Sequence, residues 1–115
     1  MTKIENAIID GFRVYVNIAQ GRIDRMSELN EGQRSALFAF FEHMTGIRHV
    51  YDIRRSSSEM FLILSSMGFC TKRISDFMGV GESSVRSIKS RIAGNRTVVE
   101  MIREFLDITS VLYSL

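Results

Sequence analysis

Residues 68–92, GFCTKRISDFMGVGESSVRSIKSRI, decide the fold that we expect for this chain. Apolar side chains recur there at spacings of three and four residues, on both sides of a glycine-containing break at Gly79–Glu82. This periodicity predicts two short helices, over 71–78 and 83–93, joined by a tight turn. The side chains expected to point inward are Ile74, Phe77, Met78, Val85, Ile88 and Ile92.

Further helices are expected on both sides of this pair. A helix over 58–67 precedes it, with Gly68 at its end, where glycine is common. After the second helix, Thr97 and Glu100 have the spacing of a capping box, which predicts a helix to about Tyr113.

The N-terminal part also has a helical pattern. Apolar residues in 3–20 follow helical spacing, although the alternation of apolar residues over 12–18 leaves a short strand open. A second helix is expected over about 32–45, ended by Gly46. The fold class that follows is all-α, with a helical N-terminal segment packed on the helices of the C-terminal half.

Composition is typical of one small globular domain. The chain has 115 residues, of which 45% are hydrophobic and 24% charged, and it contains no proline and one cysteine. The absence of proline favours helices, and one cysteine allows no internal disulfide, which fits a reducing compartment. We expect no membrane span and no signal peptide. We interpret 1–50 as a segment for dimerisation or partner contact and 51–115 as the functional region, within one compact domain.

Positive charge is concentrated in the middle of the chain. Residues 1–50 have a net charge of zero, residues 51–96 a net charge of +4, and residues 97–115 a net charge of −2. A polyanion would therefore bind the middle segment.

A helix, a tight turn and a second helix are what a protein needs to read the DNA major groove. Here the motif would span Glu59 to Ile92. The outer face of its second helix combines small serines, which allow close approach, with Arg86 and Arg91, which reach outward. An ordinary amphipathic helix pair with a polar exterior remains the alternative interpretation.

The run 68–86, GFCTKRISDFMGVGESSVR, resembles the helix-turn-helix of the LuxR/GerE family of transcriptional regulators. The resemblance extends over about residues 58–107, and region 4 of sigma factors has a similar pattern. The residues that fall in register with the family without a gap are Lys72, Ile74, Met78, Val80, Ser84, Val85 and Arg86.

The resemblance implies a LuxR/GerE-like four-helix domain and a set of DNA contacts. It implies base reading by Arg86, Ser87 and Ser90, and phosphate contacts by Thr71, Lys72, Ser84, Lys89 and Arg91. The chain departs from the family at its helix caps. Cys70 and Gly81 replace the usual capping serines, so Thr71 and Ser83 or Ser84 are expected to cap instead. The family's sensor domain is not expected either.

A homodimer is expected through the helix over 97–114. In the resembled family the helix after the recognition helix forms the dimer contact, and here it carries an apolar seam of coiled-coil spacing. A monomer in which the N-terminal helices cover this face remains open. The expected seam residues are Val98, Met101, Phe105, Ile108 and Leu112.

No catalytic, metal or cofactor site is expected. His43 and His49 lack metal-site spacing, and Cys70 is expected to be a small, partly buried residue at a helix start, with a redox role left open. The predicted function is a sequence-specific, dimeric regulator that binds double-stranded DNA in a bacterial cytoplasm, associated with the nucleoid. RNA polymerase or another regulator is a further expected partner. The alternative is an anti-activator or adaptor that uses the same fold without DNA.

Overall fold

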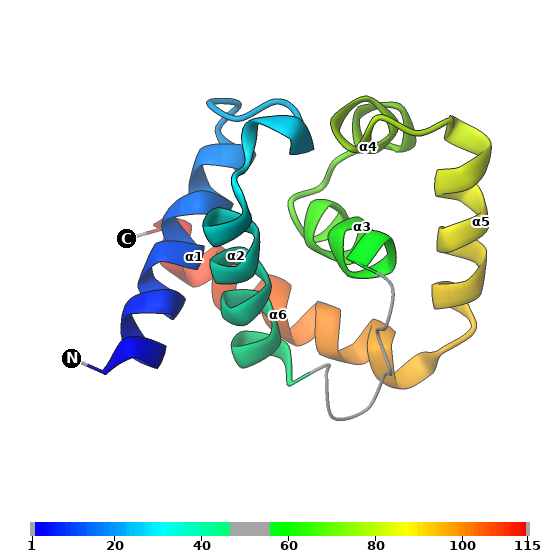
Figure 1. The fold of residues 1–115 in the computed structure, drawn as a ribbon. Coiled ribbons are helices and arrows are strands. Elements are labelled where there is room, and N and C mark those ends of the chain that lie inside the picture. The colour runs from blue at the N-terminus through cyan, green and yellow to red at the C-terminus, as the bar shows by residue number, and fades with distance from the viewer. Residues whose placement is uncertain (1, 47–55, 115) are drawn as a thin grey trace.

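Six α-helices and one short 3-10 helix make up the part of the chain that the computed structural model describes, residues 2–46 and 56–114 (Figure 1). Side chains in this part are described except at Ser56, Leu106 and 108–114. These residues form no strand, which confirms the all-α prediction for them. None of the described helices is long and apolar enough to cross a membrane.

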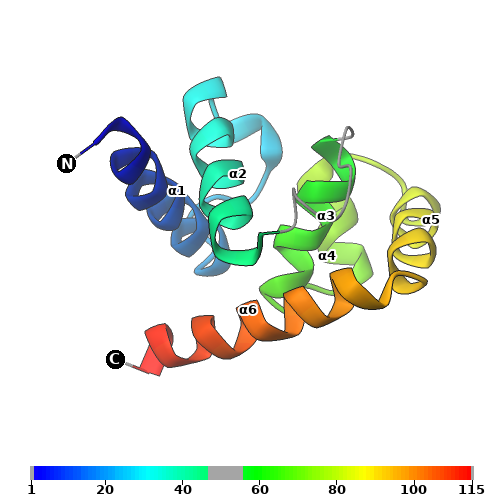
Figure 2. The same ribbon diagram turned by 90° about the horizontal axis from the view of Figure 1, so that it is seen from below.

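The helices form two groups that one long helix connects. In chain order the elements are α1 (Lys3–Ala19), η1 (Met26–Glu28), α2 (Glu31–Thr45), α3 (Ser56–Ser66), α4 (Thr71–Met78), α5 (Glu82–Ala93) and α6 (Arg96–Ser114). Helices α1 and α2 form an antiparallel hairpin at one side of the molecule, and α5 forms the opposite side (Figure 1). Helix α6 runs along both groups, as Figure 2 shows from below, and it contacts α2, α3 and α5.

Residues 12–18, where a strand remained open, lie inside α1. The buried residues of α1 are Gly11, Val14, Tyr15 and Ile18, which share one helical face. Helical spacing therefore prevails over the local alternation, because only this spacing places one continuous face against α2. The apolar face begins later than expected, since Ile4 near the start of α1 is 73% exposed.

Gly11 allows α1 and α2 to pack closely. A Cβ atom at this position would lie 2.0 Å from the backbone oxygen of Ala36 and 2.6 Å from the Cβ atom of Phe40. Neither atom can move without moving the backbone of α2, so the hairpin requires a residue without a side chain here.

Phe105 attaches α6 to the hairpin. Its ring centroid lies 5.2 Å from that of Phe41, 5.7 Å from that of Tyr15 and 6.2 Å from that of Phe40. All three pairs are steeply tilted, which is the arrangement that aromatic quadrupoles favour. The hydroxyls of Tyr15 and Ser66 are 3.0 Å apart, and that of Ser66 also donates to a backbone carbonyl within α3. Since Ser66 has one hydroxyl hydrogen, Tyr15 is the donor to Ser66.

The inward-pointing residues predicted for the α4–α5 pair are confirmed. Each is at most 8% exposed, and all belong to the same cluster as the aromatic residues of α1, α2 and α6. The hairpin and the α4–α5 pair thus share one core. The predicted residues are Ile74, Phe77, Met78, Val85, Ile88 and Ile92.

Helix ends agree with the prediction to within about two residues, but the predicted cap of α6 is wrong. Thr97 does not begin α6, because the helix starts at Arg96 and Asn95 precedes it. The Oδ1 atom of Asn95 accepts a hydrogen bond from the backbone N–H of Val98 at 3.2 Å. A side chain caps a helix only from the position just before it, so Thr97, inside the first turn, cannot take this role.

We predict that Gly11→Ala destabilises the fold by about 3 kcal/mol or more, the upper end of overpacking costs, because the new methyl group meets backbone. Gly32→Ala is the matched control, since a Cβ there meets only the side chain of Asn30 at 3.4 Å. The control should be neutral or stabilising by up to about 1 kcal/mol. Urea unfolding measures both. Equal stability of the two variants would contradict the close approach of α1 and α2.

Candidate nucleic-acid interface

A tight turn fixes the angle between α4 and α5. Gly79 ends α4 with φ 69° and ψ 32°, a left-handed conformation that favours glycine. Helix α5 begins at Glu82, one residue earlier than predicted. Only three residues therefore separate the two helices.

Ser75 holds this turn through three hydrogen bonds. Its carbonyl oxygen accepts from the backbone N–H groups of Gly79 at 2.9 Å and Val80 at 3.2 Å. Its hydroxyl donates to the carbonyl oxygen of Val80, and the residue is 8% exposed. The sequence pattern assigns no role to Ser75, because nothing in the sequence distinguishes a buried, hydrogen-bonded serine of an amphipathic helix from a solvated one.

Both helices begin without a side-chain cap. The residues before α4 and α5 are Cys70 and Gly81, and neither makes a side-chain cap hydrogen bond. The expectation that Thr71 caps α4 is wrong, because Thr71 is already the first helical residue. Ser83 and Ser84 do not cap α5 either, because both already lie inside its first turn. The first two N–H groups of each helix are thus available to water or an anion, whereas the N–H of Ser84 already donates to the carbonyl oxygen of Gly81 at 3.1 Å.

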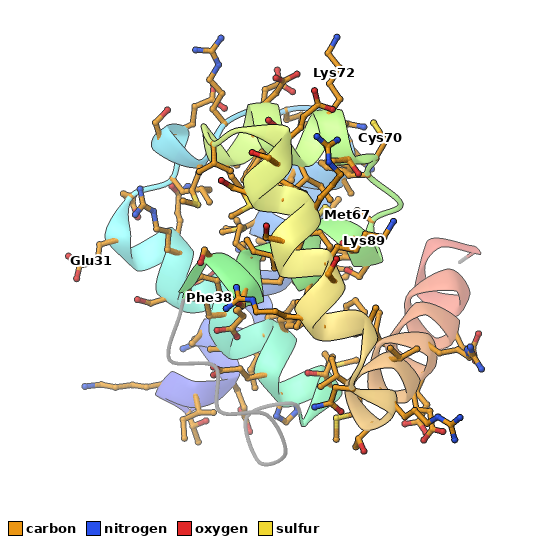
Figure 3. All side chains as sticks on the ribbon, turned by 90° about the vertical axis from the view of Figure 1, so that its right-hand side faces the viewer. Glu31, Phe38, Met67, Cys70, Lys72 and Lys89 are labelled. Carbon is orange, nitrogen blue, oxygen red and sulfur yellow. The ribbon has the colours of Figure 1, made fainter. Side chains whose placement is uncertain are left out.

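Helix α5 has a buried face and an exposed polar face. Val85, Ile88 and Ile92 are buried and attach the helix to the core. Figure 3 looks directly at α5, with Lys89 projecting from it beside the body of the molecule. The predicted DNA-contacting residues on α5 are all exposed, and these are Ser84, Arg86, Ser87, Lys89, Ser90 and Arg91.

One of the predicted base readers has its hydroxyl hydrogen engaged. The Oγ atom of Ser87 donates to the carbonyl oxygen of Ser83 at 3.0 Å, which is common for serine within a helix. In this rotamer Ser87 can only accept a hydrogen bond from a base. Arg86 and Ser90 have no such intrahelical bond in the described part of the chain.

The cations of α5 are not neutralised by carboxylates. The described residues place no carboxylate within 4.0 Å of Arg86, Lys89 or Arg91, while an exposed ion pair joins Arg13 to Asp10 on α1 at 3.8 Å. Because these cations form no direct ion pair with a carboxylate, binding to a phosphate would not require breaking one.

The two predicted phosphate contacts on α4 lie at its N-terminal end. Lys72 is exposed and points away from the body, whereas Thr71 is half-buried (Figure 3). Cys70 precedes them and is exposed, so the expectation of a partly buried cysteine is wrong. Exposure follows from its position just before the helix, outside the packed face.

Two residues of the predicted dimer seam of α6 are buried within the single chain. Val98 is fully buried and Phe105 is 1% exposed, and both belong to its core. These two side chains are therefore not accessible to a second copy in this structure, because α2, α3 and α5 pack against α6. Met101 is half-buried. The side chains of Ile108 and Leu112 lie outside the described residues.

A further charged region lies beside α4, which sequence analysis missed. An open hollow of about 860 Å³ is bordered by the segment around η1, the first half of α2 and one side of α4. Its lining includes Arg25, Arg34 and Arg73, together with Asp24 and Asp76. These residues are too distant in sequence for any local pattern to associate them.

No metal centre can be assembled from the described residues, which contain no cluster of three or more histidine, cysteine or acidic side chains. His43 is exposed on α2. His49 lies outside the described residues.

No protein-family model, curated protein or solved structure matches the chain. The interpretation of α4 and α5 therefore depends on the residues and the geometry of this chain alone.

We predict that Ser75→Ala loosens the turn and lowers the free energy of unfolding by about 1 kcal/mol, the usual net value of one hydrogen bond. Amide exchange should also become faster at Gly79 and Val80, whose orientation Ser75 fixes. Ser35→Ala is the control, since Ser35 is exposed in α2 and no described residue bonds its hydroxyl. If the two variants show the same stability and the same exchange at these amides, Ser75 does not hold the turn.

Proposed function

We propose that this chain is a sequence-specific DNA-binding transcriptional regulator that places α5 in the major groove. The observation that carries the proposal is the exposed face of α5, where Arg86, Lys89 and Arg91 have no carboxylate partner in the described structure. The opposite face is fully committed to the core, so the helix presents its polar side in one fixed orientation.

The shape of this region supports the same proposal. The major groove is about 12 Å wide and accepts one helix. Helix α5 is at the edge of the molecule, with no other described helix in front of it (Figure 3). Its serines are short, which lets the backbone approach base edges while arginines bond to guanine.

Helix α4 would contact the DNA backbone. In a helix-turn-helix the first helix crosses the backbone and braces the second. Thr71 and Lys72 at the start of α4 lie next to N–H groups that no side chain caps, an arrangement that suits phosphate. The resemblance of residues 58–107 to LuxR/GerE regulators assigns the same two residues to phosphate.

We include a homodimer in the proposal, but its contact would have to use a surface other than the buried side of α6. The described surface that fits is an apolar hollow between α1 and α2, beside the exposed Ile4. RNA polymerase or another regulator would compete for such an apolar surface, and a DNA-binding protein of this kind would act in the bacterial cytoplasm at the nucleoid. The hollow is lined by Ile8, Ile9, Phe12, Phe40 and Met44.

We predict that the protein binds mixed-sequence duplex DNA with an affinity that falls steeply as salt rises. Each phosphate that a lysine or arginine neutralises releases counterions and adds about 0.9 to the magnitude of the slope of log K against log salt. Among the proposed phosphate contacts Lys72, Lys89 and Arg91 are cationic, and these three would give a slope of roughly −3. Fluorescence anisotropy at several salt concentrations measures it. Absence of binding at low salt would reject the proposal in favour of a protein-interaction module.

We predict that Arg86→Ala weakens binding to a selected specific duplex by about 1–3 kcal/mol and binding to mixed-sequence duplex much less. The reason is its exposed position in the first half of α5, where a guanidinium can reach a base edge. Lys3→Ala is the control, since Lys3 is exposed on α1, at the side of the molecule away from α5. Equal losses on both duplexes would make Arg86 a phosphate contact instead.

A further inference from the structure

The hollow beside α4 brings together three arginines from three separate segments. Arg25 directly precedes η1, Arg34 belongs to α2 and Arg73 belongs to α4. All three are exposed, and all three border the same space of about 860 Å³. Figure 1 shows the segment around η1 and α4 side by side at the same end of the molecule.

None of these guanidinium groups has a carboxylate within 4.0 Å among the described residues. Two are oriented by uncharged partners instead. The Cζ atom of Arg73 lies 3.6 Å from the ring centroid of Phe69, and Nη2 of Arg34 donates to the carbonyl oxygen of Met26 at 3.4 Å. A ring and a carbonyl group restrict the side chains without neutralising them.

The nearest acidic residue of η1 is occupied elsewhere. Oε2 of Glu28 accepts hydrogen bonds from the backbone N–H of Asp24 at 2.7 Å and that of Arg25 at 3.2 Å. This carboxylate thus closes the turn rather than pairing with an arginine. Asp24 and Asp76 also line the hollow, which leaves its lining with a net charge of +1.

We propose that this hollow binds phosphate groups, and that these belong to the DNA strand flanking the α5 footprint. This inference deepens the proposed function and depends on it. Helix α4 is the shared element, because Lys72 and Arg73 are neighbours on it and Arg73 borders the hollow. Arginine is suited to phosphate because its planar fork donates two parallel hydrogen bonds. The N-terminal segment therefore extends the DNA-binding surface beyond the helix-turn-helix.

The test compares two triple variants of the full chain on one mixed-sequence duplex of about 20 base pairs, roughly two turns of DNA. The first is Arg25→Gln with Arg34→Gln and Arg73→Gln. The second, Lys3→Gln with Arg13→Gln and Arg103→Gln, changes the net charge equally at exposed residues outside α4, α5 and the hollow. Circular dichroism verifies that both fold.

We expect the first triple variant to reduce the slope of log K against log salt by about 2–3, since each lost phosphate contact removes about 0.9. At 0.15 M salt its affinity should fall on the order of 100-fold, and that of the control triple only a few-fold. Asp76→Asn alone should strengthen binding, because it removes a negative charge beside the arginines.

Two results would overturn the inference while leaving the proposed function intact. One is normal DNA binding by the unmodified chain together with equal slopes for the two triple variants. The other is binding of pyrophosphate in the hollow, seen as amide shifts at Ser27 and Gly79 in NMR spectra, while the arginine variants leave the slope of log K against log salt for DNA unchanged. That second result would assign the site to a free phosphorylated ligand. Failure of the unmodified chain to bind any duplex would instead reject the proposed function.

Discussion

The packing of Phe105 against the α1–α2 hairpin is the contact on which the rest of the structure depends. This ring meets Tyr15, Phe40 and Phe41, and so joins a helix that continues from α5 to the two helices at the other side of the molecule. Because Tyr15 also bonds to Ser66, the same cluster positions α3. The α4–α5 pair is therefore not an independent unit. Its first and last supporting helices are held by the N-terminal hairpin, which makes the presentation of α5 a property of the whole chain.

Rigidity at the α4–α5 turn complements this packing. The proposed insertion of α5 into a DNA groove would require a fixed angle between α5 and α4, because that angle sets where the side chains of α5 point. The core sets the position of α5 through Val85, Ile88 and Ile92, whereas Ser75 and Gly79 set its direction. The hydrogen bonds of Ser75, the left-handed conformation of Gly79 and three buried side chains thus together determine where the exposed donors of α5 lie.

The spacing of apolar residues along the sequence predicts which face of a helix is buried. It does not predict which helices pack together, or the exact residue at which a helix begins. The faces of α4 and α5 follow from the spacing of their apolar residues alone. Helix α6 is apolar on two sides, so spacing alone cannot decide which side the other helices cover, and Val98 and Phe105 of the predicted seam are buried within the single chain. A shift of the helix start by one residue also moves the cap from Thr97 to Asn95. The exposed residues of α5 were predictable because burial of one face exposes the other, whereas the hollow beside α4 depends on tertiary contacts.

The net charge of the chain is only +2, yet α5 has an exposed cationic face, because many acidic residues bond to nearby backbone or lie on other helices. Glu5 and Glu28 accept backbone hydrogen bonds at the starts of α1 and η1, where a carboxylate stabilises the turn. Glu100, Glu104 and Asp107 are exposed on α6, which follows α5 and leads away from it (Figure 2). These five carboxylates are thus used away from the exposed cations of α5, whereas Asp24 and Asp76 stay beside the arginines of the hollow. Coulombic attraction between exposed charges is largely screened beyond about 8–10 Å, so a distant acidic helix costs the cationic face little. Helices α4 and α5 together accordingly have a net charge of +3, from five basic and two acidic residues, in a chain that is nearly neutral as a whole.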